Sequence, residues 1–249
     1  MILLKHLETN VTTCCTNSCL GCNHFVALTK PTFAKPAQIE HDLTRLSKIA
    51  HVERWAVLGG EPLLHPDLLE ILEICRYSGI CDQVEVETNG DLLHTMEPIF
   101  WQSFDWLRLT IYPGKEPDMD MIRSRCSEYG ITLETKVIAN DPFVAPLKAQ
   151  PGNGQQTFDT CWYKTYCRTL DDGWFYICCT AGFIPGVILD IDKHTDGISL
   201  DGLTEDALRA YLNRKDALVS CDVCHGHHGP RIDWRQEHDP AKWLDGSKR

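Results

Sequence analysis

Cys15-Thr-Asn-Ser-Cys19-Leu-Gly-Cys22 is the stretch that most restricts the fold and chemistry of this chain. Its cysteines have the spacing C-x3-C-x2-C, so three thiolates could hold three irons of a 4Fe-4S cluster and leave the fourth iron open. A structural zinc site normally has a fourth protein ligand, and an electron-carrying 4Fe-4S cluster normally uses four cysteines. His24 could supply a fourth ligand. The spacing alone therefore leaves zinc open.

A second motif, Gly59-Gly60-Glu61-Pro62, follows the apolar segment 55–58. That segment is typical of a short buried strand that ends in a tight turn. Glycines let a backbone approach a ligand closely, and a carboxylate suits an ammonium group. The two motifs, in this order and separated by one helix-length segment, together resemble those of the radical S-adenosylmethionine (radical SAM) enzymes.

The resemblance implies that Cys15, Cys19 and Cys22 bind a 4Fe-4S cluster whose open iron chelates the amino and carboxyl groups of the methionine part of SAM. It also implies that the Gly59-Gly60-Glu61 stretch lies against that amino group. A reduced cluster would then cleave SAM to a 5′-deoxyadenosyl radical, which takes a hydrogen atom from the substrate. The resemblance further implies an electron donor such as flavodoxin or ferredoxin.

Two further positions match residues that radical SAM enzymes often place on the SAM side, namely Asn89 within Thr88-Asn89-Gly90, and Thr110. The resemblance therefore adds Asn89 and Thr110 to the expected SAM-binding residues. Taken without the resemblance, Thr88-Asn89-Gly90 is equally consistent with a strand that ends in a turn, and Thr110 with an ordinary polar strand end.

Strand-like and helix-like segments alternate over residues 1–140, which predicts a parallel sheet wrapped by helices. The expected strands are residues 3–13, 54–58, 83–88, 106–112 and 131–138, and the expected helices are 37–50, 66–77, 95–104 and 118–129. With the resemblance, this pattern indicates an α/β fold, a partial (β/α)6 radical SAM barrel over residues 1–150. In parallel barrels the reactive groups lie at the C-terminal ends of the strands, where all the motifs above fall.

Residues 151–249 form the second expected domain and hold six of the thirteen cysteines. Prolines and glycines over 141–156 indicate the linker. The spacing Cys161-x11-Gly173-x4-Cys178, followed by Cys221-Asp-Val-Cys224, resembles the SPASM and twitch extensions of radical SAM enzymes, which carry auxiliary 4Fe-4S clusters. The resemblance implies one auxiliary cluster on Cys161, Cys178, Cys221 and Cys224, with Cys167 as an alternate for Cys161 and Cys179 as an alternate for Cys178. A hairpin over 168–178 and a helix over 204–214 are also expected.

Other chemistry is open for the last two cysteines. A zinc knuckle is the main alternative, because histidines beside a C-x2-C pair are plausible zinc ligands. Its candidate ligands are Cys221, Cys224, His225, His227 and His228. The C-x2-C-H run also matches c-type haem attachment, which follows export, and we expect no export here.

Composition points to a cytoplasmic enzyme. The chain has 249 residues, of which 43% are hydrophobic, and it can bury a substantial core. A formal net charge of −11 argues against a nucleic-acid partner. The start has no signal-like pattern, and no apolar run approaches the length of a membrane span, so we expect neither secretion nor membrane insertion. In that compartment the many cysteines indicate metal rather than disulfides.

The leading functional hypothesis is a radical SAM oxidoreductase that dehydrogenates a small polar metabolite, such as a carbohydrate or aminocyclitol, with the auxiliary cluster accepting one electron. Length and the single auxiliary site resemble the radical SAM cyclitol dehydrogenases. The first alternative is a maturase of a ribosomally made peptide; because the cysteine loop begins by residue 15, leader recognition would then need a partner protein. The second is a non-catalytic zinc-binding module, which leaves Gly59-Gly60-Glu61 unexplained. Candidate proton acceptors are Glu87, Tyr112 and the histidines of 225–228; the sequence does not choose among them.

Overall fold

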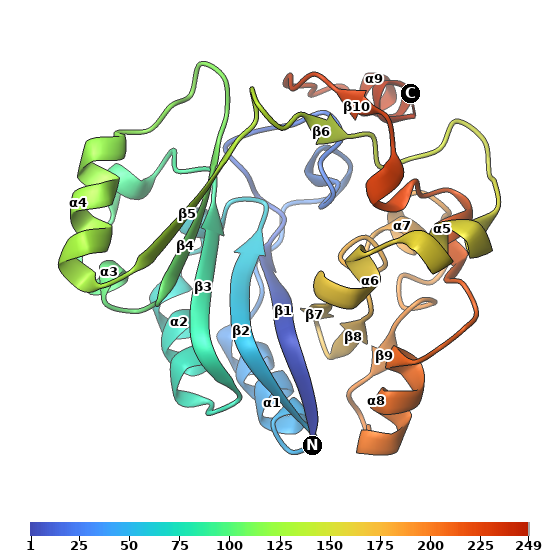
Figure 1. Ribbon diagram of the computed structural model, residues 1–249, viewed down its shortest axis with the longest axis horizontal. Helices are drawn as coiled ribbons and strands as arrows, with labels where there is room; N and C mark the ends of the chain where they lie inside the picture. Colours follow the sequence, from blue (N-terminus) through green and yellow to red (C-terminus); the bar gives the residue numbers. More distant parts are fainter. Residues whose placement is uncertain (249) are drawn as a thin grey trace. The chain divides into compact units, whose positions relative to one another are not determined.

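The computed structural model describes residues 1–248, which group into two compact units (Figure 1). The first unit contains residues 1, 3–16 and 31–141. The second contains residue 2, residues 17–30 and the described residues from 142 onward. The cysteine loop is therefore divided, because Cys15 groups with the first unit whereas Cys19 and Cys22 group with the second.

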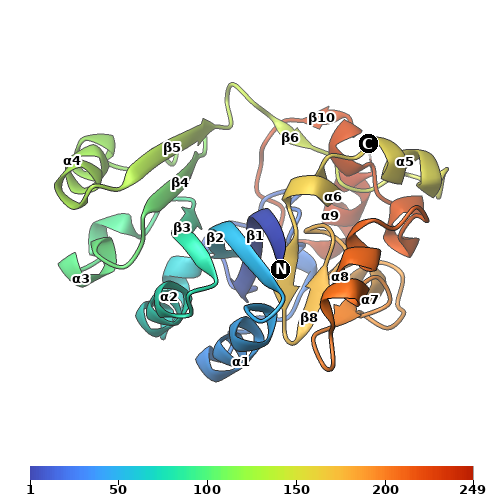
Figure 2. The same ribbon diagram turned by 60° about the horizontal axis from the view of Figure 1, so that its bottom comes forward.

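The first unit is a parallel α/β sheet with helices α1 to α4 along one face (Figures 1 and 2). Its strand order is β5-β4-β3-β2-β1, and the pairs β2–β3, β3–β4 and β4–β5 are parallel. In chain order its elements are β1 (Ile2–Thr12), α1 (Pro36–Leu46), β2 (Ala50–Gly59), η2 (Pro62–Leu64), α2 (Leu68–Tyr77), β3 (Cys81–Thr88), η3 (Leu93–Thr95), α3 (Pro98–Trp101), β4 (Trp106–Ile111), α4 (Met119–Tyr129) and β5 (Thr132–Val137).

Strand β3 shows how the sheet separates a hydrophobic face from a charged one. Val84 and Val86 are almost completely buried, and successive side chains of a strand point to opposite faces. Glu85 and Glu87 therefore share the other face. The sheet consequently has an apolar face for its helices and a face that carries ionisable groups.

The predicted α/β class is confirmed, with five strands of the expected six in this unit. The next strand along the chain, β6 (Phe143–Val144), pairs antiparallel with β10 (Arg231–Ile232) in the second unit. The helix expected over 95–104 is shorter, because Pro98 begins α3 after an extended Glu97. Strand β2 begins four residues before the expected start, at buried Ala50.

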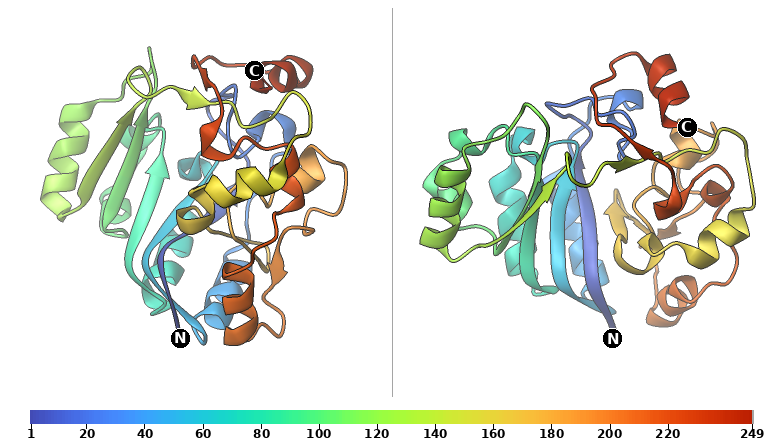
Figure 3. Two further views of the ribbon diagram at one scale, coloured as in Figure 1. Left: turned by 45° about the vertical axis from the view of Figure 1, so that its right-hand side comes forward. Right: turned by 45° about the horizontal axis from the view of Figure 1, so that its top comes forward.

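The second unit is built from short elements around two hydrophobic clusters, and its further elements can be followed in Figure 3. They are η1 (Val26–Leu28), α5 (Gly154–Thr160), α6 (Tyr163–Tyr166), β7 (Thr169–Asp171), β8 (Trp174–Tyr176), α7 (Ile184–Val187), β9 (Ile198–Ser199), α8 (Glu205–Leu212), η4 (Val219–Asp222), η5 (Gly226–His228) and α9 (Pro240–Ser247). The expected hairpin is present as β7–β8, with Asp172 and Gly173 at positive φ in its turn. The expected helix is α8, capped by Thr204.

The compact units divide the chain between residues 141 and 142, and they add residues 17–30 to the second unit. The domain boundary expected from the sequence, at 150/151, stays a prediction. Within the described residues, every helix is too short or too polar to cross a membrane.

Candidate active site

The Gly-Gly-Glu element joins the end of β2 to the end of β1. The amide of Gly60 donates to the carbonyl oxygen of Thr12 at 2.7 Å, and the amide of Glu61 donates to that of Cys14 at 2.7 Å. A Cβ atom at Gly59 would overlap the Thr12 oxygen, and one at Gly60 would overlap the Cys14 oxygen. Glycine is therefore needed for this close approach, which brings the motif beside the cysteine loop.

The carboxylate of Glu61 connects β2 to the end of β3. It is fully buried and accepts hydrogen bonds from the Thr88 hydroxyl at 2.7 Å and from the Asn89 amide at 2.9 Å. The amide of Leu63 donates to it at 3.1 Å. Burial raises the pKa of Glu61 to about 7, and these three hydrogen bonds oppose that rise. Glu61 therefore links the ends of β2 and β3. The contact of Gly59-Gly60-Glu61 with SAM stays a prediction.

Asn89 extends the network to the cysteine loop. Its side-chain amide donates to the Thr16 hydroxyl at 2.9 Å and to the sulfur of Cys15 at 3.8 Å. The Thr16 hydroxyl donates to Asp91 at 2.8 Å, and Lys115 forms an ion pair with Asp91 at 3.2 Å. Sequence reasoning singled out Asn89 but missed Thr16, Asp91 and Lys115. Their polar residue types are common in loops, and their spacing gave no signal.

A cavity of about 330 Å³ lies over the loops that follow β3 and β4. Its lining includes Gly90, Asp91 and Lys115. Thr110, the other expected SAM-side residue, occupies the position before the last residue of β4, beside Lys136 of β5. Asn89 and Thr110 therefore both lie near C-terminal strand ends, where the chemistry of parallel barrels is located.

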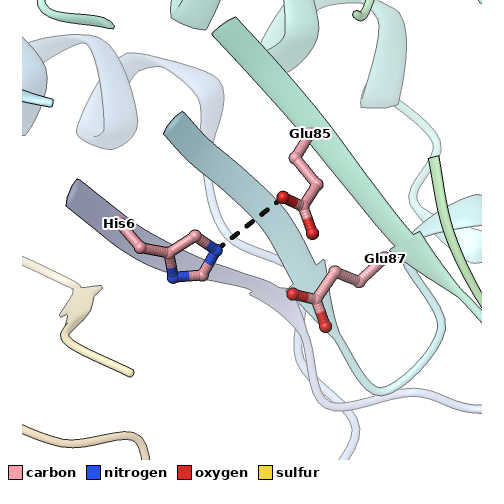
Figure 4. A group of neighbouring side chains, drawn as sticks. All are labelled: His6, Glu85 and Glu87. Atoms are coloured by element: carbon pink, nitrogen blue, oxygen red, sulfur yellow. Dashed lines mark ion pairs between the residues drawn. The ribbon is translucent and has the colours of Figure 1, made fainter. Parts of the chain in front are cut away.

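Charged side chains occupy the face of the sheet opposite its buried valines. Figure 4 shows His6 of β1 with Glu85 and Glu87 of β3, and an ion pair of 3.9 Å joins His6 to Glu85. Glu85 is fully buried between two guanidinium groups, at 3.2 Å from Arg54 and 3.1 Å from Arg108. The three ligand-type residues lie close enough to hold a cation. Two guanidinium groups already neutralise the carboxylates, however, so the set fits a charge-balanced network better than a metal site.

Glu87 is the more accessible carboxylate of this network. Its side chain is 25% exposed, and it accepts a hydrogen bond from Arg108 at 3.2 Å. Burial raises the pKa of Glu87 well above its usual value; Arg108 opposes this rise and neighbouring Glu85 adds to it. A partly exposed carboxyl group with a raised pKa is a candidate for proton transfer.

The second unit positions Cys19 and Cys22. The amide of Cys22 donates to the carbonyl oxygen of Cys19 at 3.2 Å, which folds the two cysteines into one turn. The indole N–H of Trp234 donates to the sulfur of Cys19 at 3.1 Å. Burial raises the pKa of the Cys22 thiol. His24, the alternative fourth ligand, packs edge-on against Phe183 with ring centroids 5.9 Å apart.

The sequence-predicted residues thus fit an iron–sulfur cluster in their local surroundings. Cys15 and Cys19 each have an N–H donor directed at their sulfur, from Asn89 and Trp234 respectively. Such donors are typical around cluster thiolates, whose negative charge they stabilise.

The four expected auxiliary ligands line one cavity of the second unit. Its lining includes Cys161, Cys178, Cys221 and Cys224. The amide of Gly226 donates to the sulfur of Cys224 at 3.2 Å. Gly226 has φ +59°, and a Cβ atom there would lie 2.9 Å from the sulfur of Cys161. Because Gly226 has no side chain, the sulfur of Cys161 has room beside the backbone of residue 226.

The thiols of this cavity are buried and close to one another. Burial raises the pKa of all four, and neighbouring members of the set raise it further for Cys178, Cys221 and Cys224. Metal or cluster binding would therefore release protons. Four thiols around one cavity fit a 4Fe-4S cluster with all four irons held by protein.

The alternates and the zinc-knuckle histidines are not among the described residues that line this cavity, although Cys179 lies near enough to raise the pKa of Cys161 and Cys178. Among the residues that line this cavity in the described part of the chain there is no histidine, and neither Cys167 nor Cys179 is present. The ring of His227 instead accepts a hydrogen bond from the backbone amide of Trp162 at 3.2 Å. The cavity therefore favours the four-cysteine set over the Cys/His alternative.

Comparison with known proteins supports the motif interpretation. Residues 9–108 match the Radical SAM superfamily. A probable GTP 3′,8-cyclase of Methanothermobacter marburgensis is 32% identical over 93 residues, which are 37% of this chain and 30% of that protein. The resemblance predicted from the two motifs is confirmed for this part of the chain, which carries a radical SAM domain. Proteins of this superfamily use a 4Fe-4S cluster and SAM.

Two solved structures share the fold over most of the chain. BtrN in complex with AdoMet and 2-DOIA has a TM-score of 0.57 at 13% identity, covering 86% of this chain and 84% of that one. The structure of anSMEcpe with bound AdoMet and Kp18Cys peptide has a TM-score of 0.55 at 13% identity, covering 98% and 96%. At 13% identity, these TM-scores establish a shared fold alone. The chain spans about 30% of the length of its curated relative, so the activity of the whole protein is a matter for proposal.

Proposed function

We propose that the protein is a radical SAM oxidoreductase that dehydrogenates a small polar metabolite, such as a carbohydrate or an aminocyclitol. In this reaction a CH–OH group loses a hydrogen atom, a proton and an electron, and becomes a carbonyl. Bound SAM and its cluster, held by Cys15, Cys19 and Cys22, would supply the radical that takes the hydrogen atom.

One observation carries the oxidative part of the proposal: Cys161, Cys178, Cys221 and Cys224 line one cavity in the second unit. A second cluster held there would supply a one-electron acceptor. Four thiolates leave no iron open for substrate, which favours electron transfer over substrate binding. Dehydrogenation requires such an acceptor, whereas hydrogen abstraction alone does not.

The charged face of the sheet supports the choice of substrate. His6 and Glu85 are fully buried there, and Glu8 and Arg108 are mostly buried. Hydroxyl and ammonium groups can hydrogen-bond with the more accessible members of this network, Arg108 and Glu87, whose side chains are 22% and 25% exposed. Glu87 is the proposed proton acceptor, because a carboxylate with a raised pKa is a stronger base.

The test is an anaerobic incubation with SAM, dithionite and an aminocyclitol deuterated at its carbinol carbons. We expect 5′-deoxyadenosine that carries one deuterium, together with a ketone. In Cys221→Ser the labelled 5′-deoxyadenosine should form with little ketone, because one proposed auxiliary ligand is missing. Cys167→Ser is the matched control and should form both products. Unlabelled 5′-deoxyadenosine without ketone from a panel of polyols and aminocyclitols would contradict the proposed substrate class.

Peptide modification is the second candidate, and the fold likeness to peptide-bound anSMEcpe favours it. The same label distinguishes the two candidates. Deuterium reaching 5′-deoxyadenosine from a peptide deuterated at its β-carbons, and never from a cyclitol, would replace the first proposal with the second.

A further inference from the structure

The C-terminal segment 234–247 pairs with the loop that carries Cys19, within the second unit (Figure 3). The amide of Leu20 donates to the carbonyl oxygen of Arg235 at 2.9 Å. The amide of Glu237 donates to the carbonyl oxygen of Ser18 at 2.7 Å. The Ser18 hydroxyl donates to the carbonyl oxygen of Glu237 at 2.6 Å. An antiparallel bridge joins Cys19 to Gln236. The loop is therefore held by backbone pairing on both sides of Cys19.

Helix α9 fixes this segment to the hydrophobic core. Trp243 is fully buried beside Leu20 and Phe25, and its ring centroid lies 5.6 Å from that of Phe25. Its indole N–H donates to the carbonyl oxygen of Cys19 at 2.9 Å. Trp243 thus holds the backbone of residue 19, and Trp234 contacts the side chain of the same residue.

The contact of Trp234 with Cys19 is chemically distinct from the others. Its indole N–H lies 3.1 Å from the Cys19 sulfur, compared with 3.8 Å for the Asn89 amide and the Cys15 sulfur. The Cys19 residue is only 6% exposed, so little water competes for that sulfur. An N–H donor stabilises negative charge on a thiolate, and that charge grows when the attached cluster is reduced.

We propose that Trp234 is a positioning residue that raises the reduction potential of the SAM-binding cluster through its hydrogen bond to Cys19. The inference rests on Cys19 being a ligand of that cluster, as in the proposed function. The indole N–H favours the reduced cluster over the oxidised one. The C-terminal segment thereby makes the first electron transfer easier, in addition to packing against the loop.

The test is a potentiometric titration of the reconstituted full chain, followed by electron paramagnetic resonance. The signal of the SAM-binding cluster is identified by its change when SAM is added. We expect Trp234→Phe to shift the one-electron equilibrium about tenfold toward the oxidised state, which is a midpoint lower by about 59 mV. Trp243→Phe is the matched control: it removes an indole donor to the same residue's carbonyl oxygen, and its midpoint should stay close to that of the wild type.

A second variant protects the test against a folding defect. Replacing Trp234 by β-(3-benzothienyl)alanine keeps the two-ring shape and removes only the N–H donor, so it should lower the midpoint by a similar amount. An unchanged midpoint in this variant, or an equal shift in Trp243→Phe, would overturn the inference. Failure of the wild-type signal to respond to SAM would instead contradict the proposed function.

Discussion

Gly226 offers a sharp test of the cysteine cavity in the second unit. In Gly226→Ala the new Cβ atom would lie 2.9 Å from the Cys161 sulfur, whereas ordinary contact begins at 3.4 Å. The sulfur would have to move by about 0.5 Å, and metal–ligand distances tolerate only about 0.2 Å. Alanine at φ +59° also costs roughly 1–2 kcal/mol of backbone strain.

Gly202→Ala separates these two effects. Gly202 has φ +69°, and a Cβ atom there would have nothing within 4 Å. In the metal-free protein Gly202→Ala should lose roughly 1–2 kcal/mol of unfolding free energy, and Gly226→Ala should lose at least as much, because its Cβ atom also meets Cys161. Only Gly226→Ala should interfere with a ligand sulfur.

The assay is iron and sulfide content after anaerobic reconstitution. We expect about eight irons per chain in the wild type and in Gly202→Ala, and about four in Gly226→Ala. Gly226→Ala with the full wild-type iron content would refute the reasoning, because it would show that Cys161 does not need its present position.

Two further predictions concern the first unit. Arg108→Met should destabilise the protein by about 3 kcal/mol, because buried Glu85 loses one of its two guanidinium partners. The control Arg125→Met breaks only an exposed pair with Glu128 and should cost under about 0.5 kcal/mol. Urea unfolding measures the free energy of both variants. A Glu61 pKa of about 7, above the unfolded value of 4.5, means that this carboxyl destabilises the fold increasingly as pH rises from about 4.5 to 7, by about 3 kcal/mol in total. The stability deficit of Glu61→Gln relative to the wild type should therefore shrink between pH 5 and pH 8, and a constant deficit would contradict this assignment.

Local patterns predicted much of the fold. The alternation over residues 1–140 located the five strands, because hydrophobic periodicity and turn residues act within a few positions. Asp172-Gly173 predicted the β7–β8 hairpin for the same reason: both residues adopt the positive φ that such a turn needs. The three-cysteine motif was likewise recognisable from the sequence, because Cys15, Cys19 and Cys22 all lie within one loop.

Long-range pairing was not predictable from those patterns. Strand β6 pairs with β10 after a gap of almost ninety residues, and neither two-residue strand has a period of its own. Trp234 reaches Cys19 across 215 positions, a separation that no local sequence pattern bridges. The one available signal was chemical: a half-buried indole N–H usually finds a hydrogen-bond partner.

Glu61 shows why a motif does not determine the contacts of its side chain. A carboxylate after two glycines suggested a partner for an ammonium group. In the structure the same carboxylate accepts hydrogen bonds from Thr88 and Asn89. The glycines serve the approach of β2 to the cysteine loop, a constraint that depends on two strand ends that are distant in sequence.

SAM cleavage is the most direct test of the central claim. The reconstituted protein would be incubated anaerobically with SAM and dithionite, and 5′-deoxyadenosine and methionine would be quantified by mass spectrometry. We expect the wild type to form both in equal amounts, and the variant with Cys15, Cys19 and Cys22 all changed to Ala to form neither. An iron-loaded wild type that leaves SAM intact, or a triple variant that cleaves it equally well, would contradict the radical SAM assignment of this chain.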